Sequence, residues 1–169
     1  MITLADAKAH LRVEDSAEDT LISGYIDAAT EHIEGRVGWR LREPTELTWR
    51  LYSNGSDQLW LHQPIGADDV LEVRDSSGDE VDAGDYVSRG YYLLRTDGYR
   101  WPLGHAFEVD VVAGYVAGSG RSDLMQACRI IVADLYEQRQ DLAQTMAGEG
   151  IQPLGQVDRI LSRYERVRV

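Results

Sequence analysis

The sequence contains little of what marks a secreted or membrane protein. Its single cysteine, Cys128, rules out a disulfide within the chain. No stretch approaches the roughly 18 consecutive apolar residues of a membrane span, and residues 1–15 lack the apolar run of a signal peptide. We therefore expect the protein to reside in the interior of the cell that makes it. Cys128 lies in an apolar stretch with no histidine near it, so we expect it to pack as a small apolar side chain.

Basic residues are scarce too. The chain has 17 Lys and Arg against 29 Asp and Glu, which gives a formal net charge of −12. A surface this acidic repels a phosphate backbone, so general nucleic-acid binding is not expected. The exception is the C-terminal stretch 156–169, in which four Arg accompany only Asp158 and Glu165.

Patterns of catalysis and metal binding are missing as well. The four histidines are far apart, and neither HExxH nor a Cys/His zinc spacing occurs. The glycine-rich segment 114–120 lacks the Lys-Ser/Thr ending of a phosphate-binding loop, so a flexible link is the better interpretation. Asp75, Asp79 and Asp85 do not follow the EF-hand spacing, which favours a solvated hairpin tip over a calcium site. We predict no catalytic, cofactor-binding or metal-binding residue.

The apolar residues first recur at helical spacing. Thr3 opens a capping-box pattern ahead of a short helix over residues 4–12. Ser16 gives a second start signal, for a longer amphipathic helix over 17–37, and Gly38 is a plausible stop. Both helices have apolar faces suited to packing rather than to chemistry.

Between residues 45 and 114 the period changes to two. Alternating apolar residues on either side of a Ser-Asn-Gly-Ser turn predict a hairpin over residues 46–62. Trp49 and Trp60 are expected at inward-facing strand positions, which favours core packing over a carbohydrate site. Further short apolar runs broken by glycine predict an antiparallel module of about five to seven strands.

Helical spacing returns after residue 120. A third helix is expected over residues 123–140, with Ser122 or Asp123 as its cap. It completes a helical bundle whose expected core residues are Ile22, Ile26, Ile33, Cys128, Ile131 and Leu135.

Residues 141–169 form a last segment, of which the end, 156–169, is locally basic. Val157, Ile160, Leu161 and Tyr164 make one apolar stripe, and Arg159, Arg163, Arg166 and Arg168 surround it. The pattern fits the polar side of a last helix, and it equally fits a docking peptide for a groove on a partner. Composition leaves both interpretations open.

These patterns predict an α+β fold. A helical bundle is expected from residues 1–44 and 115–140, with two N-terminal helices and a third after the insertion. An antiparallel β module over 45–114 is inserted between them, and 141–169 form a C-terminal amphipathic arm.

The order of short motifs along the chain resembles the head–tail connector proteins of long-tailed bacteriophages and gene transfer agents, also called adaptor or head-completion proteins. The opening "LADAKAHLRV" matches their Leu-x-x-Ala-Lys-x-His-Leu-Arg-Val pattern at Leu4, Ala7, Lys8, His10, Leu11, Arg12 and Val13. The segments "LWLHQPI", "RWP", "VDVVAGYVAG" and "IIVADLYEQR" are similar to the longer branch, in which a β module is inserted between the second and third helices. One departure is the start of the third helix, where Ser122 and Asp123 replace the usual Pro.

The resemblance implies a structural virion protein rather than an enzyme. Copies would pack side by side into a ring of about twelve under the portal protein and extend the DNA exit channel. DNA would pass through an acidic lumen without specific binding, and the tail-side partner would be the next connector (stopper) or a tail-terminator protein. The location implied is the head–tail interface of the virion, and the host cytoplasm during assembly, with no membrane.

Within this scheme the C-terminal arm is the predicted portal-docking segment. Its apolar stripe would provide affinity and its arginines orientation. The alternative function is a ligand-binding β module for a carbohydrate or peptide, carried by helical flanks. It predicts a monomer with an aromatic-lined pocket.

Overall fold

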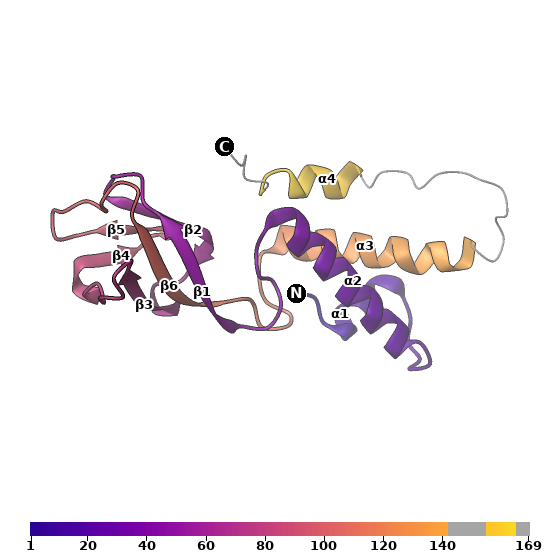
Figure 1. Ribbon diagram of the computed structural model, residues 1–169. Coiled ribbons are helices and arrows are strands. Elements are labelled where there is room, and N and C mark those ends of the chain that lie inside the picture. The colour runs from indigo at the N-terminus through magenta and orange to yellow at the C-terminus, as the bar shows by residue number, and fades with distance from the viewer. Residues whose placement is uncertain (142–154, 165–169) are drawn as a thin grey trace. The chain divides into compact units, whose positions relative to one another are not determined.

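The computed structural model describes residues 1–141 and 155–164 (Figure 1). The chain divides into two compact units: a helical unit of Met1–Arg42 with Tyr115–Val169, and a β unit of Glu43–Gly114. Helices occupy the first unit and antiparallel strands the second, so the predicted α+β fold class is confirmed.

The first helix begins as its sequence predicts. At the start of α1 (Leu4–Leu11) the Thr3 hydroxyl accepts a hydrogen bond of 3.1 Å from the Asp6 amide. The Asp6 carboxylate accepts one of 3.0 Å from the Thr3 amide. This reciprocal capping box satisfies backbone donors that have no partner within the helix. The hydrogen bonds from Thr3 also lower the pKa of Asp6, so the carboxylate stays ionised.

The second helix ends where the sequence predicts, but it begins at a different residue. Helix α2 (Asp19–Val37) ends at Gly38, whose φ of 71° is left-handed and whose amide donates to the Glu34 carbonyl at 2.8 Å. The predicted cap at Ser16 was wrong, because the N-cap is Glu18 and its side chain forms no capping hydrogen bond. An ion pair of 2.6 Å between Lys8 and Asp19 instead joins α1 to the start of α2.

The third helix, α3 (Ser122–Asp141), packs against both α1 and α2. Four of the six predicted core residues are buried, namely Ile22, Ile33, Cys128 and Ile131. Ile26 and Leu135 are half-buried and pack against that core. Burial raises the pKa of the Cys128 thiol to about 11, so it stays protonated and packs as an apolar side chain.

The β unit consists of two three-stranded antiparallel sheets. Their strand orders are β1-β6-β3 and β2-β5-β4. The strands are β1 (Thr45–Tyr52), β2 (Gln58–Ile65), β3 (Val70–Asp75), β4 (Tyr86–Ser88), β5 (Gly90–Arg95) and β6 (Ala106–Ala113), with 3₁₀ turns at Ala67–Asp69 and Ala83–Asp85.

The predicted hairpin over residues 46–62 was wrong. β1 and β2 lie in different sheets: β1 pairs with β6 along its whole length, from Thr45 opposite Ala113 to Tyr52 opposite Ala106. β2 pairs with β5 instead. The turn between β1 and β2 therefore carries the chain from one sheet to the other.

The two sheets enclose one apolar core, in which Trp101 is the largest fully buried side chain. Its ring lies edge-on to the Phe107 ring, with the ring centroids 4.9 Å apart. Its Nε1 donates a hydrogen bond of 3.3 Å to the Leu93 carbonyl. Trp49 packs partly buried against this core. The inward position predicted for Trp60 was wrong: it is 49% exposed and lies against Tyr92 on the outer face of its sheet.

Candidate partner-binding site

The described part of the C-terminal segment is a short helix that lies along the bundle. Helix α4 (Gly155–Leu161) contacts α3 and α2 (Figure 1). Val157 is 1% exposed and Leu161 is fully buried, and both belong to the core of the helical unit. Ile160 is half-buried against the same core. The apolar stripe of the predicted docking peptide is therefore covered by the chain's own bundle in this conformation.

A polar and aromatic cluster holds the end of this segment. The Tyr164 ring lies edge-on to Trp39 at 5.0 Å, and its hydroxyl donates to the Asp123 carboxylate. Arg121 donates from Nε to the same hydroxyl at 2.9 Å, and its guanidinium lies over the tyrosine ring at 5.1 Å. Residues at the start of α3 thus bind a residue three positions after the end of α4.

The electrostatics of this cluster are coupled. Burial would raise the pKa of Asp123, but hydrogen bonds from the Tyr164 hydroxyl and the Leu124 amide, with the charge of Arg121, lower it below its usual value. Burial and the bond to Asp123 raise the pKa of Tyr164. At neutral pH the tyrosine is therefore a neutral donor and the aspartate an ionised acceptor, which is the stronger kind of hydrogen bond.

Replacing Tyr164 with phenylalanine should lower the stability of the helical unit by about 1–2 kcal/mol at neutral pH, because Asp123 loses its donor. The folded-state pKa of Asp123 is depressed, so its contribution is present above its ordinary value of 3.8 and is lost as pH falls below that. The stability gap between wild type and variant should therefore narrow between about pH 5 and pH 3.

Thermal unfolding across that range measures the gap, and NMR titration of Asp123 checks its cause. The pKa of Asp123 should rise in the variant. A gap of constant size from pH 7 to pH 3 would contradict this account of the cluster.

The predicted arginines lie on the other side of the segment. Arg159 and Arg163 are exposed. Asp158, directly before Arg159, forms an ion pair of 3.0 Å with Arg36 on α2. Arg166 and Arg168 lie outside the described residues. The described portion of the segment thus presents its positive side chains outward and its apolar ones to the bundle.

Sequence reasoning missed the partners of this segment. Arg121, Asp123 and Trp39 follow no helical period, and they meet Tyr164 only because α4 packs between α2 and α3. The sequence offers one weak signal, the position of Trp39 directly after the glycine that ends α2.

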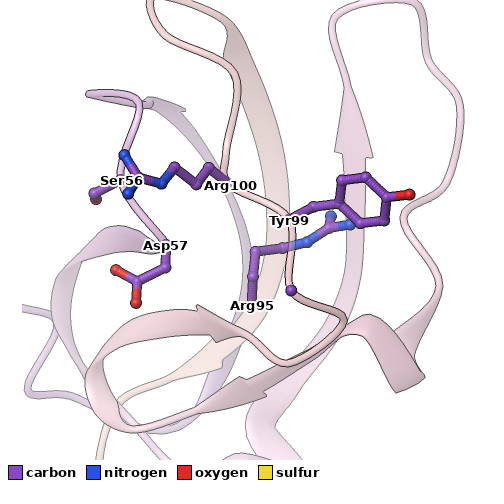
Figure 2. Close-up of a pocket in the computed structure, with 6 residues that line it drawn as sticks. Ser56, Asp57, Arg95, Tyr99 and Arg100 are labelled. Atoms are coloured by element: carbon purple, nitrogen blue, oxygen red, sulfur yellow. The ribbon is translucent and has the colours of Figure 1, made fainter.

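The β unit contains several surface hollows. One of about 350 Å³ is lined by Ser56, Asp57, Arg95, Gly98, Tyr99 and Arg100. In Figure 2 Arg100 extends towards the turn that carries Ser56. Arg95 forms ion pairs with Asp85 and Asp97 and lies over the Trp101 ring. Trp49 and Trp60 line none of the three hollows described, whose aromatic lining residues are Tyr99 and Phe107.

The acidic segment around residue 75 forms a hairpin tip. The Asp75 carboxylate accepts the amides of Ser77 at 2.8 Å and Asp79 at 3.1 Å, so it closes the turn. Over residues 1–141 and 155–164, no three His, Cys, Asp or Glu side chains gather in a way that could hold a metal ion. In the same residues, no helix is long and apolar enough to cross a membrane.

Comparison with known proteins found a family model that matches the first part of the chain. Residues 1–63 match the family model described as "Phage gp6-like head-tail connector protein". That match covers α1, α2, β1 and most of β2. The connector proteins it describes are structural rather than enzymatic. No curated protein gave a match.

Solved structures extend the similarity to the whole chain. A chain in the structure described as "Neck of empty GTA particle computed with C6 symmetry" aligns with a TM-score of 0.65 and 25% identity, over 99% of this chain and 91% of that one. A chain in "Virion of native gene transfer agent (GTA) particle" aligns with a TM-score of 0.65 and 26% identity, over the same shares. The chain thus resembles the Phage gp6-like head-tail connector proteins in its first 63 residues and gene transfer agent particle proteins over nearly its full length, which confirms the resemblance found in the sequence and supports the role of a structural virion connector.

Proposed function

We propose that this protein is a head–tail adaptor that forms a ring under the portal and extends the DNA exit channel. The observation that carries the proposal is the structural match, which includes both the helical and the β unit and comes from a particle neck. That neck was computed with C6 symmetry, and a ring of about twelve copies is a multiple of six.

The charge of the chain suits a channel for DNA. Each copy has a formal net charge of −12. A ring of such copies repels the phosphate backbone, so DNA can move through the lumen without being held. No specific DNA contact is proposed. The protein would act at the head–tail interface of the virion, after assembly in the host cytoplasm.

The C-terminal segment is our proposed portal-docking element. In the described conformation Arg159 and Arg163 are already exposed, while Val157, Leu161 and Tyr164 pack on the bundle. Docking through the arginines needs no rearrangement, whereas docking through the apolar stripe requires α4 to leave its place on α2 and α3. The tail-side partner is a stopper or tail-terminator protein.

Negative-stain images of this protein mixed with the portal protein of the same particle test the proposal. We expect an added ring of density on one end of the portal, on the same axis. The control is the portal alone. A portal that stays bare at saturating concentrations of a folded protein would contradict an adaptor role.

A further inference from the structure

The loop between β5 and β6 presents large side chains to solvent. Tyr99 is 72% exposed and Leu103 is 75% exposed. Arg100 lies between them in the sequence and is exposed as well. Within the described residues its side chain forms no ion pair or hydrogen bond. We call Tyr99, Arg100 and Leu103 the β5–β6 knob.

Backbone hydrogen bonds and a buried tryptophan fix the loop that carries the knob. Trp101, in the middle of the loop, is fully buried, and its amide donates to the Ser56 carbonyl at 2.9 Å. The Gly104 amide donates to the Ser53 carbonyl at 2.9 Å, so the loop is fixed to the β1–β2 turn at two points. In Figure 2 the side chains of Arg100 and Tyr99 leave this anchored loop in opposite directions, Arg100 towards the turn that carries Ser56. Because the backbone of this loop is already fixed, binding orders only its side chains, and Tyr and Arg are residue types enriched at the centres of protein contacts.

A surface of opposite character lies on the β1-β6-β3 sheet. A hollow of about 490 Å³ is lined by Glu46, Leu47, Thr48, Leu71, Glu72 and Asp110. It combines three carboxylates with two leucines, and Leu71 is 49% exposed. We call it the acidic hollow. It offers an apolar lining and negative charge, which match the apolar and positive side chains of the knob.

The charge of the hollow is only partly balanced. Arg74 forms ion pairs with Glu72 at 3.3 Å and with Asp110 at 2.7 Å. Glu46 forms no ion pair or hydrogen bond through its side chain within the described residues. Arg74 thus pairs with two of the three carboxylates. The third, that of Glu46, is free to accept a cation from another molecule.

The two surfaces are far apart on one β unit. The knob precedes Ala106, which pairs with Tyr52 at one end of the β1–β6 ladder. Glu46 pairs with Val112 near the opposite end. Six residues of strand separate Glu46 from Tyr52, about 20 Å at the usual rise. The knob therefore cannot reach the hollow of its own copy.

We infer that the β5–β6 knob of one copy docks into the acidic hollow of the next copy around the ring. Two complementary surfaces at opposite ends of one unit make a head-to-tail contact, which closes into a ring when the rotation per copy allows it. Copies that each carry a net charge of −12 repel one another, so their contact needs a local match of charge. The inference rests on the proposed ring and names its contact residues.

Charge exchange tests the contact. Arg100→Glu and Glu46→Arg should each lower the fraction of portals that carry a ring by at least about tenfold, because each places like charges together. The double variant, with both changes in one chain, restores opposite charges at every contact and should recover most rings. Arg89→Glu and Glu14→Arg are the matched controls, since both side chains are exposed and neither lines a described hollow. Circular dichroism confirms that each variant is folded.

The outcomes distinguish failure of the proposed contact from failure of the proposed ring. Normal rings with Arg100→Glu overturn the contact and leave the adaptor role intact. Loss of rings that the double variant fails to recover also overturns it, because Arg100 then meets some other partner. A wild-type protein that forms no ring overturns the proposed function and the contact together.

Discussion

Replacing Trp101 with alanine should destabilise the β unit by about 3–5 kcal/mol, the range for a large aromatic side chain removed from a core. The ring is fully buried between the two sheets and contacts Phe107 edge-on at 4.9 Å. The change also removes the donor to the Leu93 carbonyl, which would remain buried without it. A loss of this size is a large part of the stability of a typical domain.

The effect should be confined to one unit. The core of the β unit is separate from that of the helical unit, so the helices should retain their circular dichroism while the β unit unfolds at a lower denaturant concentration. Trp60→Ala is the matched control, because this tryptophan is 49% exposed and should cost less than about 1 kcal/mol. Equal losses from the two variants would show that Trp101 is not the centre of the core.

The helices could be predicted because their signals are local. The capping box at Thr3 and the left-handed turn at Gly38 each involve residues within one turn of the helix end. The start of α2 was predicted wrongly because its contact is not local: Ser16 has the residue type of a cap, but Asp19 at the start of α2 forms an ion pair with Lys8, from another helix.

The strand pairing could not be predicted, because it depends on residues far apart in the chain. β1 pairs with β6, and Thr45 lies opposite Ala113. A turn such as Ser53–Ser56 connects a hairpin only if the flanking strands pair with each other. The residues near the turn do not show whether those strands pair with each other or with more distant ones. Trp60 was placed wrongly because it lies between Leu59 and Leu61 in an all-apolar run. Alternation cannot decide which of two apolar sets faces inward.

The candidate site was half predictable. Helical spacing identified Val157, Leu161 and Tyr164 as one face, and the structure places all three in the core of the helical unit. What covers that face could not be read from spacing, because Arg121 and Asp123 belong to another helix. The sequence left a last helix and a docking peptide as equal alternatives. In the described conformation the segment packs as a helix, and docking remains a proposal about its exposed arginines.

Ending the chain after Gln140 should abolish co-sedimentation with the portal and lower the stability of the helical unit by several kcal/mol. The truncation removes Val157 and Leu161 from the core, and each buried aliphatic side chain contributes about 1.5–3 kcal/mol. It also uncovers Trp39, which Tyr164 now contacts edge-on. The contacts of α3 with α1 and α2 remain, so we expect a folded but less stable protein. Thermal unfolding and co-sedimentation measure the two effects separately.

A second variant distinguishes loss of binding from loss of stability. Arg159→Glu with Arg163→Glu reverses two exposed charges and leaves the buried side chains in place, so stability should change by less than about 0.5 kcal/mol. If the segment docks through its arginines, this variant should lose portal binding as fully as the truncation does. Arg50→Glu with Arg89→Glu makes the same change of net charge at exposed positions of the β unit and should bind normally. Full binding by the Arg159 and Arg163 variant, together with loss on truncation, would assign docking to the apolar stripe and require α4 to leave the bundle. Full portal binding by both the truncated chain and the Arg159 and Arg163 variant would show that the portal contact lies on another surface. The surfaces of α1 and α2 would be tested first.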